Sequence, residues 1–437
     1  MIRNVVLVLF ASGLIAGAVA SQDPGAPYTI RAEKLYVGDG TVIAPALVTI
    51  EGGRIASVSA APSGARSDAA FDVENACVTP GFVEGTSSVG LPRGAGENEE
   101  KSEVTPCARV SSVLDASDEG FRRMREAGVT TLIVSPGNRN VVGGMSVAVK
   151  PREGTARQLV LQEDLALHAV LGLEPAFRNQ SPRNGSQTLY ARRPNSRMGV
   201  VFELRRAFQE GCERNGVGTR GKSCFCDADG KLLGQVMKGE IPLAMVAHAE
   251  QDILTALNIA DEFGAKNFWL EGAVEAWLQR DLLARRGIPV LIGPVYHSSQ
   301  LPDGGGGGRR GGGAAPVGLT DKGGILGGPR LLKDAGVKFA LSQGTAETGG
   351  TLLDYAQGAV RGGLKPGDAI AAISGWPASI VGLGKRVGTV APGRDADLNV
   401  FSGDPLEPTS RLVLVIIDGV VRYRAQGQAP ESRRTVP

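Results

Sequence analysis

The stretch Val78–Gly94, VTPGFVEGTSSVGLPRG, passes from a compact apolar run into small and polar residues. The apolar run ends at Val83, and Glu84, Thr86 and Ser88 follow it. Because side chains alternate along a strand, residues two apart at its end point to the same side. Thr86 and Ser88 are therefore predicted to face the same space. The stretch is typical of a strand that opens into the mouth of an α/β barrel, where active sites form.

Downstream of this stretch, the sequence repeats an amphipathic helix, a glycine and a short apolar strand. Each repeat has apolar residues at helical spacing, a glycine near the helix end and a β-rich run. The repeats occupy residues 119–137, 252–272, 273–295 and 330–344. Such repetition over about 300 residues favours a closed (β/α)8 TIM-like barrel, which we place at residues 79–387. An open doubly wound sheet is the alternative.

Both ends of the chain have a different pattern of apolar and polar residues. The N-terminal part alternates apolar and polar residues between glycine-rich turns, and residues 388–424 do the same. This pattern is typical of short antiparallel strands. We therefore predict an α/β protein in which the barrel carries a small composite β-sandwich, formed by residues 27–78 and 388–425.

The N-terminus has the pattern of an export signal. Arg3 supplies a basic start, the run from Val5 to Ala16 is nearly all apolar, and Ala18 and Ala20 fit a small-x-small cleavage site. We expect residues 1–20 to be a signal peptide, so the mature protein would be periplasmic or secreted with no membrane span. The 47 basic residues nearly balance the 45 acidic ones. That balance gives no support for nucleic-acid binding.

Two irregular segments interrupt the barrel pattern. Three cysteines cluster at Cys212, Cys224 and Cys226, without the spacing of a zinc knuckle. Since an exported chain can form disulfides, a disulfide from Cys212 to one of the other two is favoured over a metal site. The second segment is a glycine-rich loop at 303–315, which is either a lid over the barrel or an inert insertion.

Six runs of the chain resemble the amidohydrolase superfamily, particularly its imidazolonepropionase-like branch. They appear in the family's order over nearly all of the mature chain, at residues 40–58, 76–87, 127–150, 239–265, 287–295 and 387–405. The last run contains the distinctive turn Gly-x-x-x-Pro-Gly-x-Asp-Ala-Asp-Leu. The resemblance implies a barrel plus a composite sandwich, and a metal-dependent hydrolase of C–N bonds.

The metal ligands that the resemblance implies are missing. The family's His-x-His falls on Thr86 and Ser88, and neutral hydroxyls are poor zinc ligands. The histidines expected after the fifth and sixth strands fall near Val246 and on Glu271, and the expected aspartate falls on Gly344. A hydrolase of this class needs its metal to lower the pKa of a bound water to about 7. No metal cofactor is therefore expected, and zinc only if a rearranged site is active.

A few other residues are weak catalytic or binding candidates. They are His248, which lies just after the fifth strand, His297, which follows another strand, and Glu271, which with Glu84 could act as an acid–base pair. His168 lies on an apolar pattern with helical spacing, so a packed or capping role is favoured. Lys150 ends a strand, and a solvated or salt-bridged role is favoured over a bridge between metals.

These observations lead to two hypotheses for function. The first is an exported, catalytically degenerate member of the family that binds a small ligand or serves as an accessory to an intact relative. In that role Glu84, Thr86 and Ser88 would line the barrel mouth, and the protein is expected to form an oligomer. The second is an active hydrolase of cyclic amides or small peptides with a rearranged site.

Overall fold

The structure of the chain is a computed structural model. It describes residues 27–61, 76–92, 98–99, 101–177, 193–214, 227–293, 326–344 and 350–425. The predicted signal peptide, the glycine-rich loop at 303–315, His297, Cys224 and Cys226 lie outside these residues.

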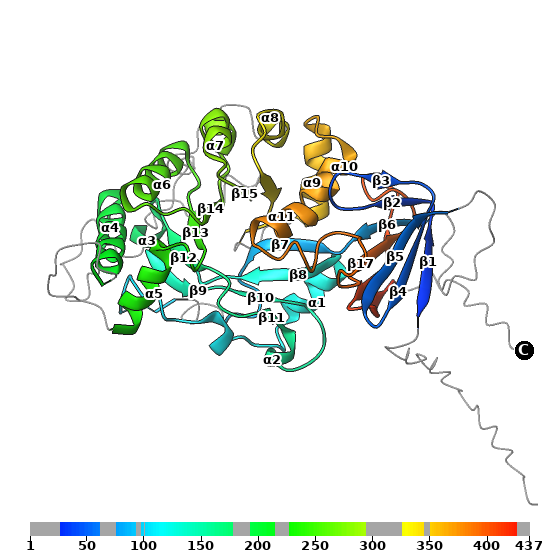
Figure 1. Ribbon diagram of the computed structural model, residues 1–437, viewed down its shortest axis with the longest axis horizontal. Coiled ribbons are helices and arrows are strands. Elements are labelled where there is room, and N and C mark those ends of the chain that lie inside the picture. Colours follow the sequence, from blue (N-terminus) through cyan, green and yellow to red (C-terminus); the bar gives the residue numbers. More distant parts are fainter. Residues whose placement is uncertain are drawn as a thin grey trace, which may run out of the picture.

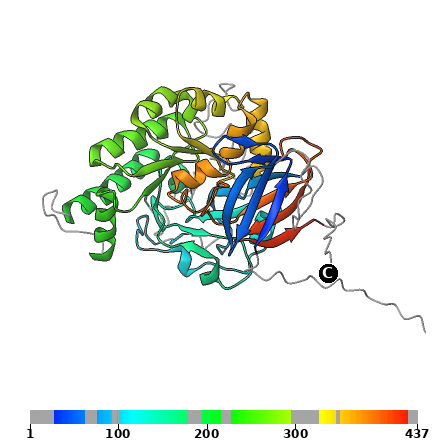
Figure 2. The same ribbon diagram turned by 45° about the vertical axis from the view of Figure 1, so that its right-hand side comes forward.

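The two ends of the chain meet in one six-stranded sheet, with the order β19-β18-β17-β6-β2-β3. Its strands are β2 (Lys34–Tyr36), β3 (Val42–Ile43), β6 (Cys77–Pro80), β17 (Leu398–Phe401), β18 (Leu412–Ile417) and β19 (Val420–Arg424). A three-stranded antiparallel sheet lies beside it (Figures 1 and 2), with the order β1-β4-β5. Its strands are β1 (Tyr28–Ala32), β4 (Ala46–Glu51) and β5 (Arg54–Ala60). We call these two sheets the terminal unit.

An apolar cluster shared by both sheets holds the terminal unit together. Ile30, Val48 and Ile55 of the three-stranded sheet pack with Leu398 and Leu414, and none of the five is more than 1% exposed. Apolar burial stabilises by roughly 25 cal/mol per Å². Since the buried residues of this core come from both ends of the chain, both ends contribute to its stability. The composite arrangement agrees with the prediction, while its assignment as a sandwich stays a prediction.

The central strands form two mixed sheets. The first has the order β16-β15-β14-β13-β12-β9, in which β12 to β16 are parallel. Its strands are β9 (Val142–Met145), β12 (Leu167–Val170), β13 (Leu243–Val246), β14 (Phe268–Glu271), β15 (Val290–Ile292) and β16 (Phe339–Leu341). The second has the order β11-β10-β8-β7, with β7 and β8 parallel. Its strands are β7 (Phe82–Ser87), β8 (Val129–Val134), β10 (Val147–Val149) and β11 (Val160–Gln162).

The closed barrel expected from the sequence is not found in the part of the chain that the structure describes. No strand ladder joins β7 to β16 there. Instead the N–H of Val83 on β7 donates to the carbonyl of Ile373, and the N–H of Leu341 on β16 donates to the carbonyl of Ala372. The backbone after a late helix thus lies between the two strands and satisfies their hydrogen bonds. The α/β class of the prediction is correct, and the closed barrel is not shown by the described residues and stays a prediction.

Helices surround the parallel strands in an arc (Figure 1). They are α4 (Arg197–Arg214), α6 (Glu250–Phe263), α7 (Arg280–Arg286), α8 (Gly328–Asp334) and α9 (Leu352–Arg361). The other helices are α1 (Glu119–Glu126), α2 (Ala156–Leu159), α3 (Glu174–Phe177), α5 (Asp227–Met237), α10 (Pro366–Ala371) and α11 (Gly375–Ile380), with 3-10 turns η1 (Val110–Ser112) and η2 (Ala276–Gln279). None of the described helices is both long and apolar enough to cross a membrane.

The predicted helix–glycine–strand repeats are confirmed at α1–β8, α6–β14, α7–β15 and α8–β16. The helical interpretation of the segment around His168 is wrong, because His168 lies on strand β12. All four residues of β12 are buried, and parallel pairing to β13 buries one edge. A short, continuously apolar run has no periodicity that separates a buried strand from a helix. The packed role predicted for His168 is correct.

The disulfide predicted for Cys212 is not tested by the structure. Cys77 and Cys212 are free thiols among the described residues, and the predicted partners, Cys224 and Cys226, lie outside them. Cys212 lies on α4 and is partly buried. Burial raises the pKa of its thiol, with a smaller contribution from the charge of Glu213.

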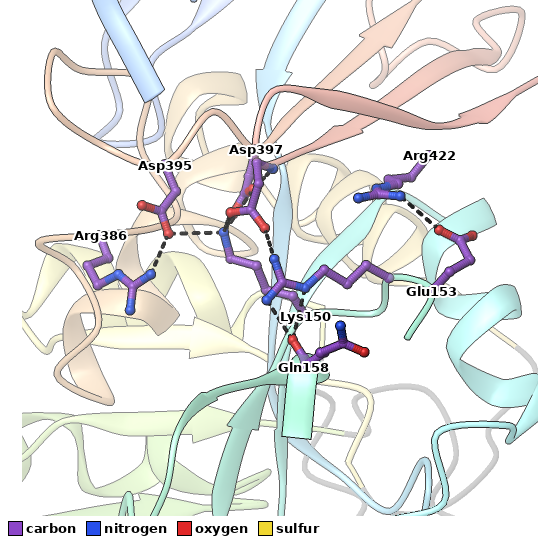
Figure 3. A network of polar contacts seen from close by, with 9 residues as sticks. Lys150, Glu153, Gln158, Arg386, Asp395, Asp397 and Arg422 are labelled. Atoms are coloured by element: carbon purple, nitrogen blue, oxygen red, sulfur yellow. Dashed lines mark hydrogen bonds and ion pairs between the residues drawn. The ribbon is translucent and has the colours of Figure 1, made fainter. Parts of the chain in front are cut away.

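A buried lysine joins the central part of the chain to the terminal unit (Figure 3). Lys150 follows β10, its side chain is 1% exposed, and its Nζ lies 3.0 Å from Asp395, 2.9 Å from Asp397 and 2.5 Å from Asp418. Burial lowers the pKa of Lys150, but the charges of the three carboxylates raise it more, so the net shift is upward. Arg386 also pairs with Asp395, at 3.0 Å. The salt-bridged role predicted for Lys150 is therefore confirmed.

Candidate functional site

Polar side chains from four strands meet inside the central part of the chain. We call this group the polar centre. It consists of Glu84 and Thr86 on β7, His168 on β12, Glu271 at the end of β14, and Ser342 directly after β16. None of these residues is more than 5% exposed. Since buried polar groups are costly unless they are hydrogen-bonded, the partners of each one determine what the site can do.

Both carboxylate oxygens of Glu84 have partners within the protein. The Ser342 hydroxyl donates to Oε1, and the backbone N–H of Gln343 donates to Oε2 over 2.9 Å. The N–H of Thr86 also approaches Oε1, at 3.3 Å. Burial raises the pKa of Glu84 to about 7, although these hydrogen bonds lower it in part. Glu84 therefore anchors β7 to the end of β16 and does not present a free carboxylate to the barrel mouth.

Glu271 has one satisfied oxygen and one without a partner. The indole N–H of Trp269 donates to Oε1 over 2.9 Å, while Oε2 has no hydrogen bond and lies 3.6 Å from His168 Nδ1. The Thr86 hydroxyl lies beside the carboxyl group without a hydrogen bond of normal geometry. Burial raises the pKa of Glu271 to about 7. Burial thus favours the protonated form of this carboxyl group.

A line of polar contacts connects His168 to His248. His168 Nε2 lies 3.0 Å from the side-chain oxygen of Asn138, and the amide nitrogen of Asn138 donates to Glu174 Oε2 over 2.8 Å. The same Glu174 oxygen lies 3.3 Å from Nε2 of His248. Burial lowers the pKa of His168 to about 4. His168 is therefore neutral at physiological pH.

His248 has both ring nitrogens engaged. Its Nδ1 donates to the carbonyl of Gly272 over 2.8 Å, and its Nε2 faces Glu174. Burial lowers the pKa of His248, but the negative charge of Glu174 and the hydrogen bonds raise it more, so the net shift is upward. A Cβ at Gly272 would lie 2.4 Å from the His248 ring, so only glycine allows this close approach.

The described residues around the polar centre do not fit the metal that the resemblance implies. A catalytic zinc site has three protein ligands from His, Asp, Glu or Cys. Within the described ranges, no group of three such side chains is spaced to hold a metal ion. Glu84 is occupied by Ser342 and Gln343, and His248 by Gly272 and Glu174.

Some of the predicted site residues lie in the polar centre and others do not. Glu84, Thr86 and Glu271 lie in it, while Ser88 follows β7 and is only partly buried. His248 lies just beyond β13, as predicted, and contacts Glu174. His297 lies outside the described residues.

The position expected for the family's aspartate, Gly344, has a positive φ of 77°, a conformation that residues other than glycine rarely adopt. Ser342, two residues earlier, is the residue whose side chain contacts Glu84. Its position directly after β16 was the signal that could have identified it.

Asn138 and Glu174 were also missed by the sequence analysis. Asn138 follows β8 and Glu174 begins α3. A polar residue soon after a predicted barrel strand was the signal available for Asn138, because such loops form the mouth of these folds. No comparable signal marked Glu174.

Comparisons with known proteins show which proteins this chain is similar to. The model of the amidohydrolase family matches residues 324–422. The amidohydrolase tasK of Hapsidospora irregularis is 25% identical over 389 residues, which cover 81% of this chain and 37% of that protein. The chain thus spans little more than a third of the length of this curated relative.

The solved structures extend the likeness over most of the chain. An amidohydrolase from Thermotoga maritima has a TM-score of 0.73 and 26% identity, covering 91% of this chain and all of the other. A Xaa-Pro dipeptidase with bound methionine has a TM-score of 0.56 at 16% identity, covering 92% of this chain and all of the other. The second likeness concerns the fold alone. Together the family match, the curated relative and the Thermotoga structure support the assignment of this chain to the amidohydrolase superfamily.

Proposed function

We propose that the protein is a catalytically degenerate member of the superfamily that binds a small ligand or serves as an accessory subunit of an intact relative. The observation that carries this proposal is the set of partners in the polar centre. Glu84 and His248 are held by neighbouring protein groups, and Thr86 stands where a metal-binding histidine is expected. In the described residues, a site with these partners can hold the strands together but offers no set of ligands for a metal that would activate water.

The proposal includes the imidazolonepropionase-like branch, because the runs that carry that resemblance include both residues 76–87 and the 387–405 turn. It also includes assembly into an oligomer or with a relative. The alternative function is hydrolysis of C–N bonds in cyclic amides or small peptides by a rearranged site. His248 favours it in one respect, since the net upward shift of its pKa favours the protonated ring, which could act as a general acid.

Restoring the two histidines of the first strand tests the proposal. The double variant Thr86→His/Ser88→His should show no hydrolysis of cyclic amides or dipeptides in the presence of zinc. The reason is that Val246, Glu271 and Gly344 still stand where further ligands are expected. The measurement is product formation by mass spectrometry, with the parent protein as control. Turnover that a chelator abolishes would support the alternative instead.

Export is part of the proposal. The basic, apolar and small residues up to Ala20 support cleavage by a signal peptidase. The protein recovered from outside the cytoplasm should begin near Ser21, and intact-mass measurement checks this. A mass that includes Met1 would contradict export through a cleaved signal.

A further inference from the structure

Three buried polar atoms of the polar centre have no hydrogen-bond partner. They are the hydroxyl oxygen of Thr86, Nδ1 of His168 and Oε2 of Glu271, which come from three different strands. Unpaired buried polar atoms are rare in folded proteins, and each one calls for a physical explanation. Three together, on residues no more than 5% exposed, indicate a shared partner.

The contacts of Asn138 fix which nitrogen of His168 carries its proton. The amide nitrogen of Asn138 donates to Glu174, so the Asn138 oxygen is the atom that faces His168 Nε2. An oxygen acceptor requires a donor opposite it, so Nε2 carries the hydrogen. In a neutral imidazole the other nitrogen is then an acceptor. His168 Nδ1 therefore needs a donor.

Glu271 cannot supply that donor directly. Its Oε2 lies 3.6 Å from His168 Nδ1, which is too long for a hydrogen bond in either protonation state. When Glu271 is ionised, two acceptors face each other across this gap. Two atoms at that separation can, however, each lie about 2.8 Å from a third atom placed between them. A molecule that both donates and accepts would satisfy them together with the Thr86 hydroxyl.

We infer that Thr86, His168 and Glu271 bind one water molecule at the polar centre. The water donates to His168 Nδ1, exchanges a hydrogen bond with Glu271 Oε2 and accepts from the Thr86 hydroxyl. Three polar partners are the usual number for a buried water. A zinc ion in the same place would have only one imidazole and one carboxylate as strong ligands, fewer than zinc sites use.

This inference deepens the proposed function, since it names what occupies the place of the metal. It also explains what the polar contacts between His168 and His248 do. An amide does not pass a proton along, so Asn138 positions the imidazole of His168 and fixes its tautomer. Glu174 in turn fixes the orientation of Asn138. The water then links β7, β12 and β14 at the point where the superfamily's metal would do so.

A high-resolution crystal structure of the mature protein tests the site, with crystals grown without ammonium salts and then soaked in zinc. We expect one light-atom peak within hydrogen-bond distance of all three side chains and no anomalous signal at the zinc edge. Thr86→Val should remove the peak or reduce its occupancy at least twofold, while Thr86→Ser, which keeps the hydroxyl, should retain it. A zinc peak would overturn both this inference and the metal-free function. An empty centre in the parent protein would overturn this inference alone.

The tautomer is tested separately by nitrogen NMR of the histidine rings. The chain has three histidines, so the variants His248→Gln and His297→Gln are sufficient to assign His168. We expect a neutral ring with the hydrogen on Nε2 from pH 8 down to about pH 5. A hydrogen on Nδ1, or a doubly protonated ring at neutral pH, would overturn the water site without restoring a metal site.

Discussion

Replacing Lys150 by methionine should reduce the free energy of unfolding by about 3–5 kcal/mol. The substitution keeps an apolar stem of similar length but leaves Asp395, Asp397 and Asp418 facing one another without the shared cation. Arg386 still pairs with Asp395 and Arg152 with Asp418, but Asp397 loses the cation that compensates its buried charge, and a buried charge left without its partner is costly. Urea unfolding followed by tryptophan fluorescence at neutral pH measures the effect.

The matched control is Lys338→Met at an exposed position directly before β16. Surface substitutions away from special features usually change stability by less than about 0.5 kcal/mol. If both variants lose the same small amount, Lys150 does not hold the terminal unit to the central strands. The comparison separates the role of the cluster from the general effect of losing a lysine.

The second large effect is a loss of stability as the pH rises from about 4.5 to about 7. The folded-state pKa of Glu271 is raised from 4.5 to about 7, chiefly by burial. A group with a raised folded pKa stabilises the protein fully below its unfolded pKa, and the contribution is lost as the pH rises through the folded pKa. A rise of this size corresponds to roughly 3 kcal/mol. Glu84 contributes in the same direction.

Glu271→Gln should flatten this pH dependence, because the amide cannot ionise. Its oxygen can still accept from Trp269, and its nitrogen can donate toward the water or His168. The variant should therefore gain stability relative to the parent protein between pH 5 and pH 8, measured by urea unfolding at each pH. Glu51→Gln, at an exposed position, serves as the control and should leave the profile unchanged. An unchanged profile for Glu271→Gln would show that the carboxyl group is already ionised in the folded protein.

The elements of the fold were predictable where the sequence has local periodicity. The α6–β14 and α8–β16 units follow directly from apolar spacing and a glycine at or shortly after the helix end. His168 was misassigned because β12 is too short and too uniformly buried to show a strand period. The closure between β7 and β16 was also not predictable, since it depends on two carbonyls, at 372 and 373, that no sequence pattern marks.

The polar centre was predictable only in part. Glu84, Thr86 and Glu271 follow from strand ends, because side-chain alternation fixes where they point. The contact between Glu84 and Ser342 joins residues 258 positions apart, and the link through Asn138 depends on how two loops meet. Such contacts are set by the packing of the strands and not by local sequence. This is why the sequence predicted the residues at the strand ends but not the contacts that they make.

The metal content of the purified mature protein tests the central claim most directly. After purification without chelators, elemental analysis should find far less than one zinc per chain, and added zinc should hardly change the melting temperature. Zinc at a hundred times its dissociation constant would stabilise a binding protein by about 2.7 kcal/mol, which is easily detected. Stoichiometric zinc, a clear rise in melting temperature and amide hydrolysis that a chelator abolishes would contradict the degenerate site.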